Sequence, residues 1–224
     1  MVTSSAGLGT PALLLLALSA CAPAVQGPAA SPPQPRASAS DARAAADSVR
    51  RSYTAADVEF MTHMIGHHAQ AIEMARLTPT HDASPSVRIL SERIINAQQD
   101  EIATMQRWLR ARHQPVPEAE PAGIKMKMDG AEHVMLMPGM LTEDQMKQLD
   151  AARGREFDRL FLTLMIQHHK GALTMVDRLF GSHGAAQEDA IFKFASDVSA
   201  DQSTEVARMQ TMLAAMPPET RSSR

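Results

Sequence analysis

Apolar residues recur at the three- and four-residue spacing of a helix face in four stretches of the chain, and helix start and stop signals bracket these stretches. Thr54, followed three residues later by Asp57, resembles a capping box at the start of the first stretch, and Pro79 stops it. Ser84 and Pro85 open the second stretch as N-cap and first helical residue. These signals predict a helical hairpin.

A second hairpin follows with similar punctuation. Gly154 precedes its first helix, Gly181 interrupts the chain after that helix, and Pro217 ends the last one. Between the hairpins, residues 141–151 repeat the capping pattern and predict a short extra helix. No stretch alternates apolar and polar residues as a half-buried strand does. The chain is therefore predicted to be all-α, with four long helices and a minor one.

We expect one folded domain, a bundle of these helices over residues 51–216. Its parts are a first hairpin at 53–113, a Met-rich connector at 114–153 and a second hairpin at 154–216, and a disordered tail follows at 217–224. Composition agrees with this prediction, since aromatic residues make up only 4% of the chain and Ala, Leu and Met dominate.

The two hairpins repeat one another. Residues 60–74 and 161–175 carry tandem histidines in identical register, and residues 98–105 and 202–209 repeat a pattern of Gln, Glu and Met. An internal repeat of this kind indicates a duplicated bundle in which two half-sites face one another. Metal binding is the first function that this pattern suggests.

Helical geometry places the tandem histidines on, or at the edge of, a broad apolar face of each first helix. Buried imidazoles need polar partners. Gln98 and Glu101 lie among apolar residues on the second helix, and Gln202 and Glu205 repeat this arrangement on the fourth. These side chains are therefore the expected partners of the histidines.

Residues four apart on a helix can hold one ion together, whereas adjacent residues diverge. This spacing pairs Met64 with His68 and Met165 with His169. His63 is a secondary candidate, because Leu164 replaces it in the second copy. The bundle candidates for metal ligation are His63, Met64, His67, His68, Glu101, Met105, Met165, His168, His169, Glu205 and Met209.

Thioether ligands favour Cu(I), and imidazole also accommodates Cu(II) or Zn, so copper is the expected ion, with zinc and iron as alternatives. A metal-free interpretation stays open, in which the buried histidines and glutamates bond to one another and no ion is needed. Asp57 and Asp158 also match between the copies, but each lies near a helix start and is expected to be structural.

The connector holds a second group of candidate ligands. Its Met-x-Met spacing on a segment rich in Gly and Pro would let thioethers converge on a soft ion, although the same methionines could simply pack against the bundle. These candidates are Met126, Met128, His133, Met135, Met137 and Met140. The remaining histidines, His81, His113 and His183, lie in loops or at helix ends and are expected to be solvated.

The N-terminus is typical of an export signal. Residues 1–20 include a short apolar run, and residues 18–21 resemble a bacterial lipobox whose Cys21 would carry the lipid, although residues 1–11 lack the usual positive charge. Residues 21–50 are rich in Pro, Ala and Ser and indicate a flexible tether. We therefore expect a periplasmic or cell-surface lipoprotein held to the membrane through Cys21, unless Cys21 is merely part of a disordered leader.

Charge and motif content exclude several classes of function. A net charge of -3 without a basic stripe argues against nucleic-acid binding, and a single cysteine excludes an intramolecular disulfide. The chain has neither a Gly-rich phosphate loop after a strand nor a nucleophile elbow.

Several of these motifs resemble the bacterial domain-of-unknown-function family 305. Residues 137–209 carry them as Met137-Pro138-Gly139-Met140, the tandem histidines at 168–169 and the Glu205 to Met209 run, and residues 60–105 resemble the other half of that family. Its members are ferritin-like four-helix bundles, exported or membrane-anchored, and some are linked to copper or silver binding and tolerance. The resemblance, which spans about residues 53–213, implies the same fold and a copper role for this chain.

We therefore expect an exported copper-binding protein that buffers, chaperones or detoxifies the ion, rather than an enzyme. A homodimer and a partner protein that handles copper are both compatible with this function. Two alternatives come from other classes. A ferritin-like metal oxidase would use ligation dominated by carboxylates, and a metal-free interaction module of the cell envelope would use the histidines and glutamates as a hydrogen-bond network.

Overall fold

The structure is a computed structural model that describes residues 53–121, 123–128 and 131–217. The expected signal peptide at 1–20, the lipidated Cys21 and its tether, and most of the expected tail lie outside these residues. None of the helices among the described residues is long and apolar enough to cross a membrane.

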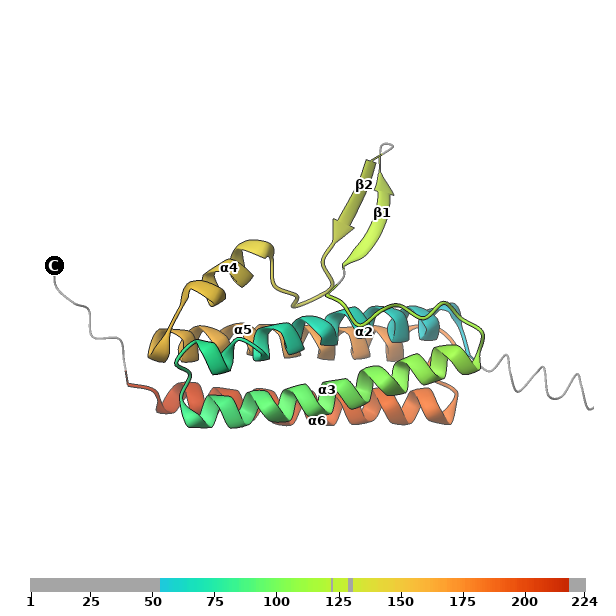
Figure 1. The fold of residues 1–224 in the computed structure, drawn as a ribbon. Coiled ribbons are helices and arrows are strands. Elements are labelled where there is room, and N and C mark those ends of the chain that lie inside the picture. Colours follow the sequence, from blue (N-terminus) through green and yellow to red (C-terminus); the bar gives the residue numbers. More distant parts are fainter. Residues whose placement is uncertain (1–52, 122, 129–130, 218–224) are drawn as a thin grey trace, which may run out of the picture. The chain divides into compact units, whose positions relative to one another are not determined.

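Within the described residues, four long helices form what we call the helical bundle: α2 (Ala55–Ala75), α3 (Pro85–Ala111), α5 (Gly154–Gly181) and α6 (Asp189–Ala215). Helix α2 packs against α3, α5 packs against α6, and the two hairpins meet where α2 contacts α5 (Figure 1). A 3₁₀ turn, η1 (Thr78–Thr80), follows α2, and the predicted extra helix is α4 (Glu143–Ala151), which contacts α5. The all-α class is confirmed.

The capping signals act as the sequence predicts. The Thr54 side chain accepts a hydrogen bond from the Asp57 backbone N–H, and the Asp57 carboxylate accepts one in return from the Thr54 backbone N–H. Thr142 and Gln145 form the same capping box at α4. Each box satisfies backbone N–H groups that a helix start otherwise leaves unpaired, so it fixes the first residue of its helix.

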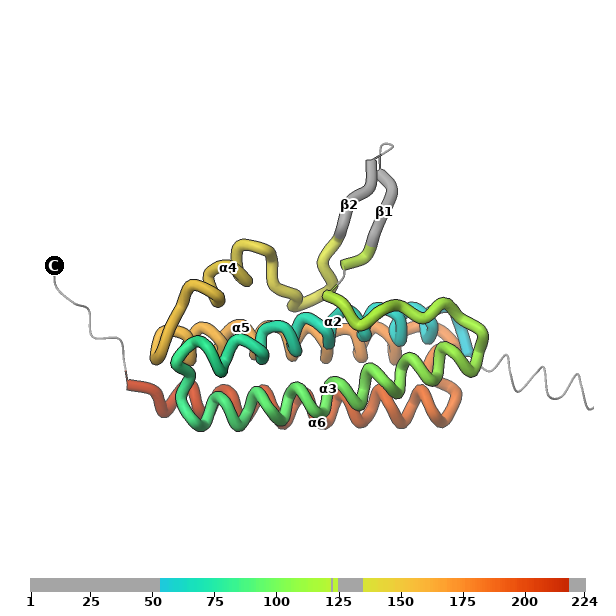
Figure 2. The backbone as a smooth tube through the Cα atoms, viewed as in Figure 1, coloured from blue at the N-terminus to red at the C-terminus, as the bar shows by residue number. Residues whose placement is uncertain are grey.

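The connector differs from the prediction. After α3 the chain runs back along α2 (Figure 2). It then forms two antiparallel strands, β1 (Ile124–Met128) and β2 (Ala131–Met135), with Ile124 opposite Met135. The expectation that no strand forms was therefore wrong. The missed signal is the Asp-Gly dipeptide at 129–130, flanked by alternating apolar and lysine residues, which is typical of a two-residue hairpin turn.

The core of the helical bundle has a polar layer between two apolar clusters. On α2, the second cluster takes Ala71, Met74 and Ala75, and the first cluster takes Ile72 together with four residues before the tandem histidines, which are Phe60, Met61, Met64 and Ile65. The other three helices cross from one cluster to the other in the same way. The buried polar side chains in this layer are His67, His68, Gln98, His168, His169 and Gln202, with Glu101 and Glu205 at its edge.

Candidate metal centre

The contact between α2 and α5 brings the tandem histidines together at the middle of the helical bundle. His67 and His168 are in contact as a tilted pair, with ring centroids 3.9 Å apart and planes inclined by 41°. His68 and His169 point away from this pair, each 6.3 Å from its sequence neighbour. All four side chains are 0% exposed, so any ion that reaches them is enclosed by protein.

Glutamates from the second helix of each hairpin face His68 and His169, which we call the outer histidines. The Nε2 atom of His169 donates a hydrogen bond of 2.6 Å to Oε2 of Glu205. The Nε2 atom of His68 lies 2.7 Å from Oε2 of Glu101, without the direction of a hydrogen bond. The duplicated sequence pattern thus becomes a duplicated pair of imidazole and carboxylate, with better geometry in the second hairpin.

Burial keeps His67 and His168, which we call the inner histidines, in the neutral form. Desolvation lowers the pKa of His67 to about 3, aided by the neighbouring His68 and His169 and opposed by the Pro138 carbonyl. Desolvation also lowers the pKa of His168 well below its ordinary value, and His67 adds to this shift. A neutral imidazole carries a lone pair on one ring nitrogen, which is the form that binds metals.

Several polar atoms of this layer lack a hydrogen-bond partner among the residues that the structure describes. The Nδ1 atoms of the four tandem histidines are buried without one, and the same holds for Nε2 of His168 and both amide atoms of Gln98. Because Nε2 of His67 donates to a carbonyl and Nε2 of His169 to a carboxylate, the lone pair of each ring lies on Nδ1. Each hairpin therefore buries an imidazole nitrogen, Nδ1 of His67 or of His169, whose lone pair accepts no hydrogen bond from the described residues.

The candidate methionines of the bundle are buried in the apolar clusters. Met64, Met105, Met165 and Met209 are all 0% exposed, and the first and third lie one helical turn from His68 and His169. In the parts of the chain that the structure describes, no three His, Cys, Asp or Glu side chains come together as a metal-binding set.

The turn at residues 137–140 closes one side of the tandem histidines. Nε2 of His67 donates a 2.9 Å hydrogen bond to the Pro138 carbonyl, and Nε2 of Gln167 donates one of 3.3 Å to the Gly139 carbonyl. Gln70 bonds both the N–H and the carbonyl of Leu141, at 2.7 and 3.0 Å. Sequence reasoning missed Gln70, and its only signal was a polar residue on the apolar face of α2.

The methionines of the connector divide into two groups. Met137 and Met140 are 3% and 5% exposed and pack in the first cluster, whereas Met135 is 51% exposed. For Met126, Met128 and His133 the structure describes only the backbone, so their proposed ligand role falls outside the described side chains. The packing alternative thus accounts for Met140, and Met137 also lines a cavity beside α2 and α5.

Comparison with known protein families identifies the family of this chain. A profile of the family described as domain of unknown function (DUF305) matches residues 57–213. This chain belongs to the DUF305 family. The match spans both hairpins and the connector, and every bundle candidate for metal ligation lies within it. A comparison with curated proteins gave no match.

Solved structures of DUF305 proteins resemble this chain. A fragment from Deinococcus radiodurans is 26% identical with a TM-score of 0.61, and the match covers 73% of this chain and 99% of that one. A protein from Streptomyces coelicolor that is inferred to be secreted is 27% identical with a TM-score of 0.59, covering 71% of this chain and 92% of that one.

A third similar structure is that of CopM in a Cu(I)-bound form. It is 26% identical with a TM-score of 0.54, and the match covers 70% of this chain and 95% of CopM. CopM also has structures in Cu(II)-bound and Ag-bound forms.

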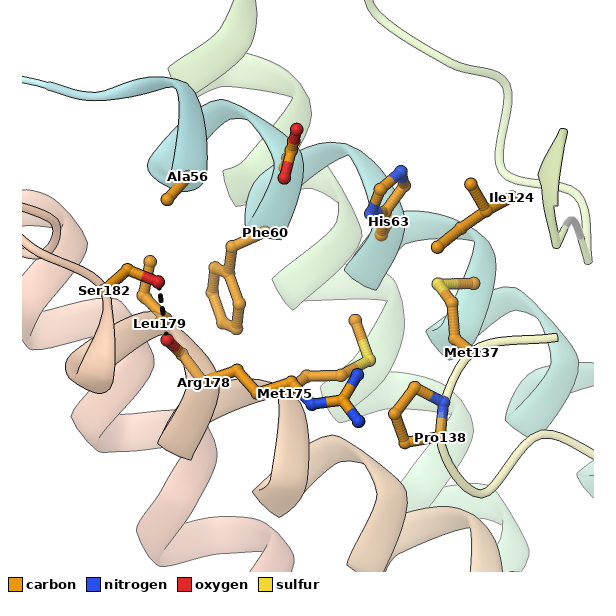
Figure 3. Close-up of a pocket in the computed structure, with 11 residues that line it drawn as sticks. Ala56, Phe60, His63, Ile124, Met137, Pro138, Met175, Arg178, Leu179 and Ser182 are labelled. Atoms are coloured by element: carbon orange, nitrogen blue, oxygen red, sulfur yellow. Dashed lines mark hydrogen bonds between the residues drawn. The ribbon is translucent and has the colours of Figure 1, made fainter. Parts of the chain in front are cut away.

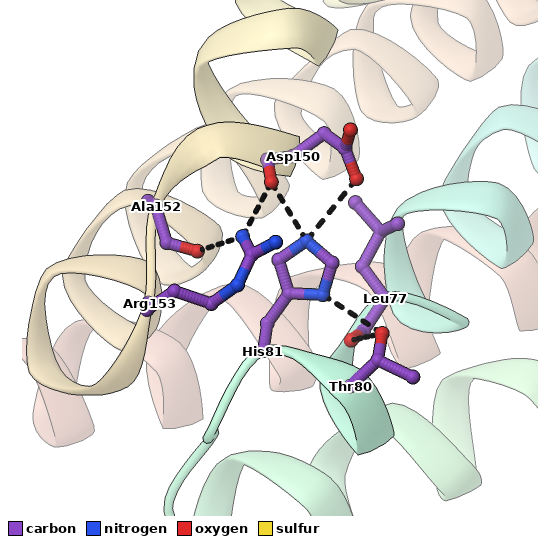
Figure 4. A network of polar contacts seen from close by, with 6 residues as sticks. All are labelled: Leu77, Thr80, His81, Asp150, Ala152 and Arg153. Atoms are coloured by element: carbon purple, nitrogen blue, oxygen red, sulfur yellow. Dashed lines mark hydrogen bonds and ion pairs between the residues drawn. The ribbon is translucent and has the colours of Figure 1, made fainter.

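His81 of this DUF305 protein corrects one expectation from the sequence. It is 3% exposed rather than solvated, and Nε2 lies 2.9 Å from the carbonyl and 3.1 Å from the carboxylate of Asp150 (Figure 4). Its Nδ1 lies 2.9 Å from the Thr80 hydroxyl. The loop between α2 and α3 is thereby tied to the end of α4. Since both ring nitrogens have partners, His81 has a structural role; His113 and His183 are exposed, as expected.

The matching aspartates also have structural roles. Oδ1 of Asp57 accepts a 2.7 Å hydrogen bond from the Ala186 N–H in the loop between α5 and α6. The Asp158 carboxylate accepts bonds of 3.1 and 3.2 Å from the Ser84 N–H, between α2 and α3. Each first helix thus binds the loop of the opposite hairpin, and the duplication is reciprocal.

Proposed function

We propose that this DUF305 protein is an exported copper-binding protein with a ferritin-like four-helix bundle, which holds copper for buffering, chaperoning or tolerance. One observation carries the proposal. Both hairpins bury an imidazole that faces a carboxylate through Nε2 and keeps Nδ1 without a partner among the described residues. The Cu- and Ag-bound forms of CopM support the choice of ion.

The arrangement of each pair suits a metal ligand. A histidine that binds a metal through one ring nitrogen usually donates its other N–H to a carboxylate or a carbonyl, which sets the tautomer and raises the basicity of the ligand. Glu205 and Glu101 occupy that supporting position for His169 and His68, and the Pro138 carbonyl occupies it for His67. We therefore assign the two glutamates to support rather than to direct ligation.

Donor chemistry favours copper. Neutral imidazoles together with thioether sulfurs form a soft ligand set, which suits Cu(I), and imidazole also accepts Cu(II). His68 with Met64 and His169 with Met165 are the pairs that one helical turn brings to the same ion. His67 and His168, whose ring centroids are 3.9 Å apart, add two more imidazoles to the same layer.

The energetic cost of the unpartnered polar atoms in this layer also favours a bound ion. A buried polar atom without a partner costs about 1–3 kcal/mol, and the polar layer of this core contains several such atoms. A bound ion would use the free lone pairs on the imidazoles and offset part of this cost. A core that never held an ion would be more stable with apolar side chains at these positions.

Export and a lipid anchor at Cys21 complete the proposal. The apolar run and the lipobox-like residues 18–21 support them, as does the inferred secretion of the Streptomyces coelicolor protein. On a tether, the bundle would take up copper near the membrane surface and pass it to a copper-handling partner.

A competition titration tests the proposal. The purified protein is titrated anaerobically with Cu(I) against a chromophoric chelator, beside a His68→Ala, His169→Ala double variant. The matched control is His81→Gln, which changes a buried histidine whose ring nitrogens already have partners. Tight binding that the control keeps and the double variant loses would support copper in the bundle. The absence of Cu(I) and Cu(II) binding in the wild type would contradict the proposal.

One observation favours a metal-free alternative, an interaction module held together by its own polar layer. The hydrogen bond between His169 and Glu205 gives Nε2 of the ring and Oε2 of the carboxylate a partner without an ion. A ligand that binds only the folded state raises the stability of that state. Copper binding therefore predicts a higher melting temperature with the metal, and the metal-free module predicts no change. A melting temperature that no metal changes would favour the metal-free module.

A further inference from the structure

A cavity of about 210 Å³ lies between α2, α5 and the turn of the connector, apart from the tandem histidines (Figure 3). Phe60 and Leu179 form part of an apolar wall. Because a water molecule occupies about 30 Å³ of liquid volume, the cavity has room for an ion together with several waters.

Three side chains of types that can ligate a soft metal line this cavity, each from a different element: His63 from α2, Met137 from the connector and Met175 from α5. Figure 3 shows these three side chains around the same cavity, each coming from its own element. Met137 and Met175 are only 3% and 7% exposed, so packing holds both side chains in place. His63 is half-buried and gives the cavity a route to solvent.

The charge around the cavity suits an ion of low charge. The three donors are neutral when His63 is unprotonated, and burial lowers the pKa of His63 while Glu59 opposes that shift. Glu59 and Arg178 are exposed at the cavity and carry opposite charges. Two thioethers and one imidazole form a soft, uncharged ligand set, which selects Cu(I)-like ions over hard divalent ions such as Mg²⁺.

We propose that His63, Met137 and Met175 form a separate binding site for one soft monovalent cation, Cu(I) or Ag(I). The choice of ion rests on the proposed function, but none of the three ligands belongs to the tandem histidines. Pro138 also lines the cavity, and its carbonyl is the hydrogen-bond partner of His67. The site therefore lies beside the enclosed polar layer.

The internal duplication makes this site unique. At the matching positions of the other hairpin, Leu164 replaces His63 and Met74 corresponds to Met175. Leu164 has no donor atom, so the repeat offers no second site of this kind. The proposal therefore predicts one additional equivalent of metal, whatever the bundle binds.

Titration with Ag(I) tests the site without an added reductant. Binding is measured by calorimetry, and the methyl groups of the 16 methionines are followed by NMR after selective ¹³C labelling. The variants are Met137→Leu with Met175→Leu, which keeps apolar volume, and His63→Ala. The matched controls are Met61→Leu, a buried methionine of α2 that does not line the cavity, and His113→Asn, an exposed histidine.

We expect Ag(I) to shift the methyl signals of Met137 and Met175 in the wild type. We also expect the double methionine variant to lose one equivalent, or to bind it about tenfold more weakly or worse, since even groups that only support a ligand contribute that much. Both controls should bind as the wild type does. The NMR result on the wild type does not depend on any variant being folded.

Three other outcomes decide between the proposals. Unshifted Met137 and Met175 signals, with Ag(I) bound and lost in the His68→Ala, His169→Ala variant, would overturn this site and leave the proposed function standing. Shifted signals, with every equivalent of Ag(I) retained in that variant, would support this site and contradict copper in the bundle. If the wild type bound neither Ag(I) nor Cu(I), both proposals would be wrong.

Discussion

Adjacent histidines in this protein have different surroundings because a helix turns by about 100° for each residue. His67 meets His168 across the contact between α2 and α5, whereas His68 faces Glu101 on α3. His168 and His169 repeat this division. One histidine of each pair therefore joins the two hairpins, and the other joins the helices within a hairpin.

The burial of the inner pair makes stability depend on pH. His67 has a pKa of about 3 in the folded protein and His168 is also well below the ordinary value of 6.5, near which both titrate in the unfolded chain. Between these values only the unfolded chain binds the protons, so stability is complete above about pH 6.5 and falls as the pH drops toward 3. Each histidine contributes a slope of about 1.4 kcal/mol per pH unit at most.

Urea unfolding of the metal-free protein between about pH 7.5 and about pH 5 measures this slope. The His168→Gln variant should lose about half of the histidine-dependent part, because one of the two titrating rings is gone. A wild-type stability that stays constant as the pH falls would contradict the assignment of two neutral, desolvated rings.

At the scale of elements, the turn at residues 137–140 packs directly on α5. A Cβ atom on Gly171 would lie 1.9 Å from the Pro138 carbonyl oxygen and 2.6 Å from Cα of Gly139. Gly139 itself has a φ of +76°, which only glycine adopts readily. Backbone therefore meets backbone at this contact, and the contact also presents the Pro138 carbonyl to His67.

Gly171→Ala should push the turn away from α5 and destabilise the protein by about 1–3 kcal/mol or more, the usual cost of overpacking. The matched control is Gly181→Ala at the end of the same helix, where a Cβ atom would meet no described atom within 4 Å. Its effect should stay within about 1 kcal/mol, since Ala is the better helix former. Equal unfolding midpoints for the two variants in urea would show that the turn does not need this contact.

At the scale of the whole molecule, two reciprocal contacts hold the hairpins together. Asp57 binds the loop of the second hairpin and Asp158 binds the loop of the first, through backbone N–H groups. Both carboxylates are nearly buried, at 1% and 6% exposure. A helix start that binds the neighbouring loop fixes how the two hairpins align along the bundle, and this alignment brings the tandem histidines to the same level.

Asp57→Ala should destabilise the protein by about 1–3 kcal/mol, because it leaves the buried Ala186 N–H without its acceptor. Asp197→Ala is the control, since that carboxylate is 56% exposed and pairs with Lys193 one turn away on α6. Its cost should be about 0.5 kcal/mol or less. Thermal unfolding of both variants gives the comparison, and an Asp57 variant as stable as the Asp197 variant would argue against the reciprocal contact.

The sequence alone determined the helices, their caps and the duplication. Helix periodicity and the capping boxes at Thr54 and Thr142 depend on residues three or four apart, so they are visible in the order of residues. The turn signal of the β1–β2 hairpin is equally local but weak as a strand signal, because lysines and methionines alternate there instead of the usual strand formers.

Tertiary structure alone decided how the candidate ligands meet. The bond from His67 to Pro138 spans 71 residues and the bond from Ala186 to Asp57 spans 129, and no local pattern encodes distances of that kind. The contact between His67 and His168, the burial of His81 and the meeting of His63, Met137 and Met175 at one cavity likewise depend on how separate elements pack. The sequence could name the ligand types and their helices, but packing between helices chooses which side chains share a space, because that choice depends on the full set of core contacts.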